Sequence, residues 1–116
     1  MKIVALLLAL LVAPVHAEPT KEQQQEARVR FKKGLELYRD ADYRASLIEF
    51  RRAYELAPNY NVLYNIGQVY YQLQDYAAAL ATLEKYLADG GTTIPAERRA
   101  EVEKDIAKLR ERVRKH

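Results

Sequence analysis

Two stretches of the chain repeat one residue pattern at a distance of 33 positions, which aligns Gly34 with Gly67 and Asp42-Tyr43 with Asp75-Tyr76. The correspondence continues with Ala45-Ser46-Leu47 and Ala78-Ala79-Leu80, with Phe50 and Leu83, and with Ala53 and Tyr86. A period in this range, with a glycine inside each of two helical segments, is typical of helical hairpins stacked in a row. Stacked hairpins usually bind other molecules and seldom catalyse reactions. The repeat therefore indicates a binding protein.

The first residues have the pattern of a secretory signal peptide. Lys2 precedes an unbroken apolar run over residues 3–13, and Pro14 follows it. Residues 15–17 then provide the small or β-branched side chains of a cleavage site before Glu18. The alternative, an uncleaved membrane anchor, needs about 20 apolar residues, and this run is much shorter. We expect cleavage after residue 17 and no insertion of the mature chain into a membrane.

The composition of the exported part argues against a nucleic-acid partner and excludes disulfides and lipid attachment to a cysteine. The whole chain has 19 Lys and Arg against 16 Asp and Glu, and loss of Lys2 reduces the excess to two. Such a small excess does not favour a nucleic-acid partner. The chain has no cysteine, so neither a disulfide nor a lipid-bearing thiol is available. We expect an exported protein, located in the periplasm or otherwise secreted.

Local signals predict an all-helical domain. Thr20 and Gln23 fit a capping box, in which the threonine hydroxyl and the glutamine side chain satisfy backbone amides at the helix start. Asp42 is placed to cap the second helix, and residues 89–93, which include two glycines, are expected to form a loop. Helices are predicted over residues 21–39, 43–56, 61–73, 76–88 and 95–114, with no strand signal between them.

These features resemble the tetratricopeptide repeat family, whose unit is a helical hairpin of about 34 residues. In the first unit, residues 27–59, the matching positions are Gly34, Leu37, Tyr43, Ser46, Phe50, Ala53 and Pro58. In the second unit, residues 60–92, they are Leu63, Ile66, Gly67, Tyr70, Asp75, Tyr76, Ala79 and Leu83. The resemblance implies an all-α, right-handed α-solenoid of two hairpins, with residues 94–115 forming a C-terminal capping helix.

The departures from the family pattern concern the two ends of the array. Arg30 and Lys33 occupy positions that are usually large and apolar, which indicates a first unit whose outer side faces solvent. In the last helix Val102, Ile106, Leu109 and Val113 form a narrow apolar stripe. We expect this stripe to cover the end of the second hairpin. The alternative is a coiled-coil or dimer seam, for which the stripe is short.

The mature chain lacks the residues that common catalytic sites need. Its one histidine is His116, its one serine is Ser46, and it has no cysteine. No serine or cysteine nucleophile can therefore be paired with a base. No metal-ligand spacing and no glycine-rich phosphate loop occur in the sequence. We expect no enzymatic activity, no metal and no cofactor.

The resemblance also indicates where a partner would bind, because the first helix of each hairpin lines the concave face in this family. The residues it assigns to that face are Arg28, Lys32, Tyr38 and Arg39 of the first unit and Asn61, Tyr64, Asn65, Gln68, Tyr71 and Gln72 of the second. Amides can bond to an extended backbone, and Arg and Lys favour an acidic segment or a C-terminal carboxylate. Phe31 and Leu35 belong to the same face, and the alternative is that they only pack against Tyr64 and Gln68.

Three functions follow from these observations. The first is a monomeric adaptor, or scaffold, that binds a protein or peptide of the cell envelope on its concave face. The second is a structural, self-associating subunit of an envelope assembly that uses the helix ends and the apolar stripe of the last helix. A third, less favoured by the sequence, is binding of anionic cell-wall material. A role with chaperone C-termini is not expected, because Phe31 and Leu35 replace the polar residues of that subfamily and no third unit exists.

Overall fold

The computed structural model describes residues 17–115, which form five α-helices and one 3-10 turn in chain order. The helices are α1 (Lys21–Arg39), α2 (Tyr43–Leu56), α3 (Tyr60–Gln72), α4 (Tyr76–Gly90) and α5 (Ala96–Arg114). No strand occurs in this part of the chain. The predicted signal peptide lies outside the described residues, apart from Ala17.

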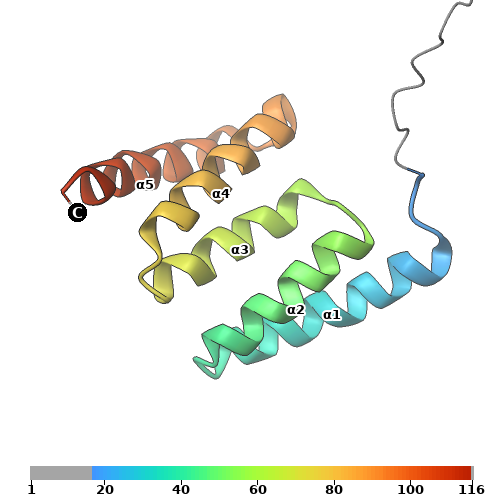
Figure 1. The fold of residues 1–116 in the computed structure, drawn as a ribbon. Helices are drawn as coiled ribbons and strands as arrows, with labels where there is room; N and C mark the ends of the chain where they lie inside the picture. Colours follow the sequence, from blue (N-terminus) through green and yellow to red (C-terminus); the bar gives the residue numbers. More distant parts are fainter. Residues whose placement is uncertain (1–16, 116) are drawn as a thin grey trace, which may run out of the picture.

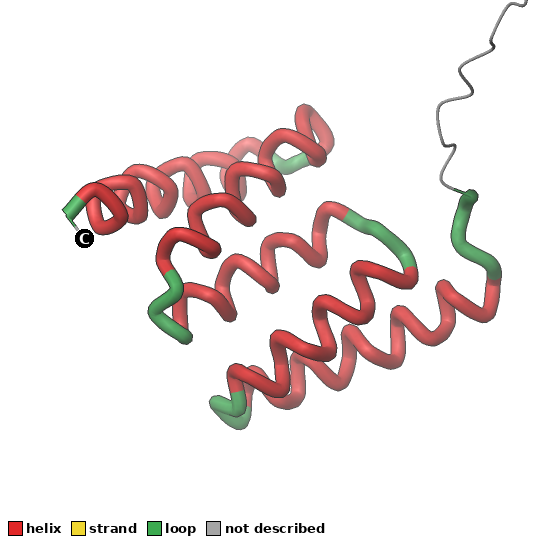
Figure 2. The backbone as a smooth tube through the Cα atoms, in the orientation of Figure 1, coloured by secondary structure: helices red, strands yellow, loops and turns green. Residues whose placement is uncertain are grey.

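Each helix packs mainly on its neighbours in the sequence, as in a one-dimensional array. The main contacts join α1 to α2, α2 to α3, α3 to α4 and α4 to α5. In Figure 1, α2 and α4 lie in front, and α1 and α5 lie behind them. Figure 2 shows the short loops that join the helices. The prediction of an all-α solenoid of two hairpins and a final helix is confirmed.

The first helix begins as predicted. The Gln23 amide donates to the Thr20 hydroxyl at 3.1 Å, and the Thr20 amide donates to the Gln23 side chain at 2.9 Å. Both halves of the capping box are therefore present. Asp42 stands at the N-cap of α2, but its side chain makes no capping hydrogen bond, in contrast to Asp75, which accepts from the Ala78 amide at 3.3 Å.

Both hairpins turn through the same left-handed residue position, which the sequence did not reveal. Ala41 has φ 60° and Gln74 has φ 61°. The following aspartate amides bond back to the helix, Asp42 to the Leu37 carbonyl at 2.9 Å and Asp75 to the Tyr70 carbonyl at 3.0 Å. This is the Schellman arrangement, in which glycine is the usual left-handed residue. Here alanine and glutamine carry the strain.

The loop predicted over residues 89–93 is wrong in its first half. α4 continues through Asp89 and Gly90, and only Gly91–Thr93 leave the α-helix, in a 3-10 turn that starts at positive φ. Gly90 has ordinary helical dihedrals, φ −77° and ψ −31°, and its missing side chain makes room for two neighbours. A Cβ there would lie 2.5 Å from Ile94 Cδ1 and 2.8 Å from Tyr60 Cδ2. The chain needs this glycine for close packing and uses Gly91 for the turn.

Inside each hairpin the two helices meet at a glycine. A Cβ on Gly34 would lie 2.7 Å from ring carbons of Phe50, and one on Gly67 would lie 2.6 Å from Leu83 Cδ2. Ser46 completes the first contact, because its buried hydroxyl donates to the Gly34 carbonyl at 2.8 Å. The predicted close approach is therefore present, with Phe50 and Leu83 as the side chains that fill the space over the glycines.

The central residues of the apolar stripe on α5 are buried against the rest of the chain. Val102, Ile106 and Leu109 are at most 4% exposed and join the core that contains Leu83 and Tyr86 of α4. The stripe therefore covers the end of the second hairpin, as expected. In this structure its buried residues offer no surface to a second chain.

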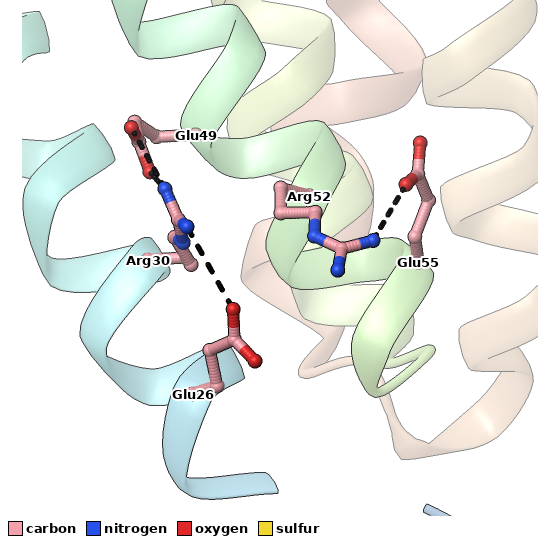
Figure 3. Close-up of polar contacts among 5 residues, drawn as sticks. All are labelled: Glu26, Arg30, Glu49, Arg52 and Glu55. Atoms are coloured by element: carbon pink, nitrogen blue, oxygen red, sulfur yellow. Dashed lines mark hydrogen bonds and ion pairs between the residues drawn. The ribbon is translucent and has the colours of Figure 1, made fainter. Parts of the chain in front are cut away.

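The outer side of the first hairpin is solvated, as the sequence predicted. Arg30 forms ion pairs with Glu26 at 3.7 Å and with Glu49 of α2 at 3.2 Å (Figure 3). Figure 3 also shows the Arg52–Glu55 pair on α2, at 3.4 Å. Except for Glu49, which is partly buried, these side chains are largely exposed, so the exposed pairs contribute little to the free energy of unfolding.

Gly34→Ala should lower the free energy of unfolding by up to about 2 kcal/mol. The clash with Phe50 costs about 1–3 kcal/mol, and the better helix propensity of alanine offsets about 1 kcal/mol of it. Urea unfolding followed by circular dichroism measures the change. Gln25→Ala, on an exposed position of the same helix, is the control and should shift stability by less than about 0.5 kcal/mol. A gain in stability from Gly34→Ala would contradict the close contact at Gly34.

Gln74→Gly should raise the free energy of unfolding by about 0.5–1 kcal/mol. Relief of left-handed strain gains about 1–2 kcal/mol, less about 0.4–1 kcal/mol for the greater freedom of glycine in the unfolded chain. Gln25→Gly makes the same chemical change within α1 and should instead lower stability, by up to about 1 kcal/mol. The same urea titration compares them, and two destabilised variants would show that Gln74 is not strained.

Truncation after Gly91 should lower the melting temperature and remove part of the helicity of the remaining chain. It uncovers Leu83 and Tyr86, each 2% exposed in the intact fold. In the intact chain, Leu109→Ala should lower the free energy of unfolding by about 2–4 kcal/mol, whereas Lys104→Ala on the exposed part of α5 should have little effect. A truncated chain that melts at the original temperature would refute a stabilising role for α5.

Candidate functional site

Helices α1, α3 and α5 share one side of the molecule, which we call the inner face, and two clefts open there. The α1–α3 cleft has a volume of about 550 Å³. The α3–α5 cleft is smaller, about 210 Å³. The helix common to both, α3, contains no charged residue from Tyr60 to Gln72. The inner face therefore has a neutral centre made of tyrosine and amide side chains.

The α1–α3 cleft brings together residues of both hairpins. Arg28 and Phe31 of α1 line it opposite Asn61 and Val62 of α3. The other residues around it are Pro19, Gln24, Ala27, Ala53, Ala57, Pro58 and Asn59. The ring of Phe31 also packs on Phe50 of its own hairpin, with centroids 5.4 Å apart. Phe31 thus contributes both to the core and to the wall of this cleft.

Other residues predicted for the site lie near the second cleft or join the two hairpins. Gln68 and Tyr71 line the α3–α5 cleft, and Tyr71 is 41% exposed. The Gln72 side chain donates to the Tyr38 hydroxyl at 3.5 Å, across the junction between hairpins. The Asn65 side chain donates to the Asn61 carbonyl of its own helix at 3.2 Å, which leaves its amide oxygen for a ligand.

Tyr64 belongs to the packing as much as to the surface. Its ring lies 5.6 Å from that of Tyr86, and the Arg98 guanidinium of α5 lies 4.1 Å above it. Burial raises the pKa of the Tyr86 hydroxyl, and the nearby Arg98 charge opposes that rise. The Tyr86 hydroxyl therefore stays neutral at ordinary pH, and the contact of Arg98 with the Tyr64 ring attaches α5 to α3.

Six of the ten predicted residues line neither cleft: Lys32, Tyr38, Arg39, Tyr64, Asn65 and Gln72. Lys32 and Arg39 are exposed on α1. Leu35 packs against the core, half-buried. A ligand would reach Lys32 and Arg39 only by extending along α1.

The site predicted from the sequence did not include any residue of α5. Asp105, Lys108 and Arg112 line the α3–α5 cleft together with Gln68 and Tyr71 of α3. These residues flank the apolar stripe on the helix, so helical periodicity places them beside the buried side. Periodicity alone does not decide which flank turns toward α3, because that depends on how α5 crosses α4.

Among the described residues some cations are paired with carboxylates and others are not, and the unpaired ones include Arg44 and Arg51 of α2. Several cations away from the two clefts, such as Arg30, Lys85 and Arg110, are paired with carboxylates at 2.7–3.7 Å. Within residues 17–115, no carboxylate lies within 4.0 Å of any cation in a second group. This group contains those predicted for the inner face, Arg28, Lys32 and Arg39, and those that α5 adds to it, Lys108 and Arg112. The inner face therefore has uncompensated positive charge on both sides of the neutral α3.

Between residues 17 and 115, no group of three or more His, Cys, Asp or Glu side chains is placed to hold a metal ion. None of the helices in this range is long and apolar enough to cross a bilayer.

Comparison with known families identifies the second hairpin. The tetratricopeptide repeat model matches residues 60–88, which cover α3 and most of α4. No curated protein matches the chain significantly. The first hairpin repeats the matched one in its central glycine, its left-handed turn and its following Asp-Tyr pair. The family match over the second hairpin and the repeat of that hairpin in the first support a tetratricopeptide repeat protein.

Proposed function

We propose that this protein is an exported, non-enzymatic adaptor that holds an extended peptide segment of a partner protein on its inner face. Tetratricopeptide repeats generally mediate protein–protein interactions, and proteins of the family are typically adaptors without catalytic activity. The observation that carries the finer proposal is the uncharged α3, which lies between two helices with uncompensated cations. A peptide lying across α3 would meet amides and tyrosines first.

The exposed side chains of α3 suit an extended backbone. Asn61 and Gln72 are exposed at opposite ends of the helix, and each amide offers a donor and an acceptor. Tyr71 adds a large, rigid contact surface at low entropic cost. Peptide groups present alternating donors and acceptors. The amides of Asn61 and Gln72 can therefore bind the main chain of a peptide without requiring one particular sequence. Selectivity would come from the cations on α1 and α5.

The location that we propose depends on the N-terminal sequence. Lys2, the apolar run of residues 3–13 and the small residues before Glu18 are typical of a cleaved signal peptide. Export to the periplasm, or otherwise secretion, would place the adaptor among proteins of the cell envelope.

Self-association is the second candidate, and one observation favours it. Val29 of α1 and Ile48 of α2 are 58% and 67% exposed, so the first hairpin presents two aliphatic side chains that a second chain can cover. The other surface first considered for self-association, the stripe on α5, has its central residues buried against the rest of the chain. An assembly would therefore use the first hairpin.

Site-specific photocrosslinking distinguishes these two functions. We expect benzoylphenylalanine at Asn61 or Gln72 to capture a partner protein in cells that make this chain, because both positions are exposed on the inner face. The same group at Ile48, exposed on α2, is the matched control and should give no adduct with that partner. Mass spectrometry of the adducts identifies the captured peptide.

Two outcomes would contradict the proposed adaptor function. Adducts of the chain with itself at Ile48, together with a dimer mass in light scattering of the purified protein, would favour the self-associating subunit. A monomer that captures its partner at Ile48 but at neither inner position would refute the inner-face assignment.

A further inference from the structure

The α3–α5 cleft combines an apolar floor with a charged rim. Leu83 of α4 and Leu109 of α5 line it and are each 2% exposed. Lys108 and Arg112 line it as well, and both are exposed residues. An occupant therefore meets apolar carbon at the bottom and positive charge at the edge.

Arg112 is held in place before any ligand arrives. One guanidinium nitrogen donates to the Tyr76 hydroxyl at 2.6 Å, and the group lies 4.7 Å from the centre of the Tyr76 ring. The ring of Tyr71 is also near, at 5.9 Å. A guanidinium has five N–H donors, so most remain for a ligand. Because the side chain is already ordered, binding loses less entropy.

The charge of the cleft is positive overall. Two cations, Lys108 and Arg112, face one carboxylate, Asp105, which also lines the cleft. Among the described residues neither cation has a carboxylate within 4.0 Å. Arg110, on the same helix, instead pairs with Glu84 of α4 at 3.3 Å. The helix therefore neutralises a cation outside the cleft and leaves those at the cleft available.

We infer that this cleft takes a glutamate side chain of the peptide bound on the inner face. The inference rests on the proposed function and adds a specificity to it. The two methylenes of glutamate match the floor of Leu83 and Leu109, and its carboxylate reaches the rim, where Lys108 and Arg112 can donate to it. Gln68, which also lines the cleft, offers an amide to the neighbouring peptide group. A backbone carboxylate at a chain end has no methylenes to occupy the floor.

Binding of a hexaglutamate peptide, acetylated and amidated at its ends, tests the inference by isothermal titration calorimetry with the purified protein. Blocked ends leave side-chain carboxylates as the only charges. We expect hexaglutamate to bind and blocked hexaglutamine to bind at least tenfold more weakly. Lys108→Ala should weaken hexaglutamate binding about fivefold, as for loss of one exposed ion pair.

The matched controls use the same helix. Arg110→Ala removes one positive charge outside the cleft and should change the dissociation constant less than twofold. Asp105→Asn removes the opposing carboxylate and should tighten binding a few-fold. All three positions are at most partly buried, and circular dichroism checks that the variants fold.

Equal weakening by Lys108→Ala and Arg110→Ala would mean general attraction to a basic protein and would overturn the inference. Equal binding of hexaglutamine, or no binding of hexaglutamate, would do the same. None of these three results affects the proposed function. Asn61 and Gln72 lie outside this cleft, so crosslinking at these two positions tests peptide binding on the inner face independently.

Discussion

The close approach of two helices at Gly34, and again at Gly67, sets the spacing on which the rest of the solenoid depends. Phe50 and Leu83 lie where a Cβ on these glycines would be, so each hairpin closes around one large side chain from its second helix. That closure leaves the next hairpin a fixed surface to pack on. The regular stacking then places α1, α3 and α5 on one side of the molecule, and the clefts of the inner face follow from it.

The last helix has two roles in this arrangement. Its apolar stripe covers the core, as a solvating helix must at the open end of a repeat array. Its flanking residues also form a wall of the inner face, where Arg98 stacks on Tyr64 and Arg112 on Tyr76. Two hairpins are few for a stable array, and this helix provides both the missing burial and a third lining element.

Packing and binding use some of the same side chains on the inner face. Tyr64 lies between Tyr86 and Arg98, whereas Tyr71 is open to solvent at the α3–α5 cleft. A mutation at Tyr64 would therefore disturb the fold together with any binding. Lys108 carries its charge at the cleft without such a packing role, which makes it the better position for separating the two effects.

The repeat of Gly34 and Gly67, the capping box at Thr20 and the stripe on the last helix sufficed to predict the helices, their order and the family, because they act over a few residues. Helix ends were less predictable: Ala41 and Gln74 take a left-handed turn without glycine, since tertiary packing of the hairpin compensates for local strain. The glycine pattern predicts a loop at Gly90, but this residue lies in the helix, where Ile94 and Tyr60 occupy the space that a side chain would take. The amino-acid pattern placed Gln68 and Tyr71 on the inner face. Only the tertiary structure decided that Lys108 and Arg112 join them, because the flank of α5 that meets α3 depends on how that helix crosses α4.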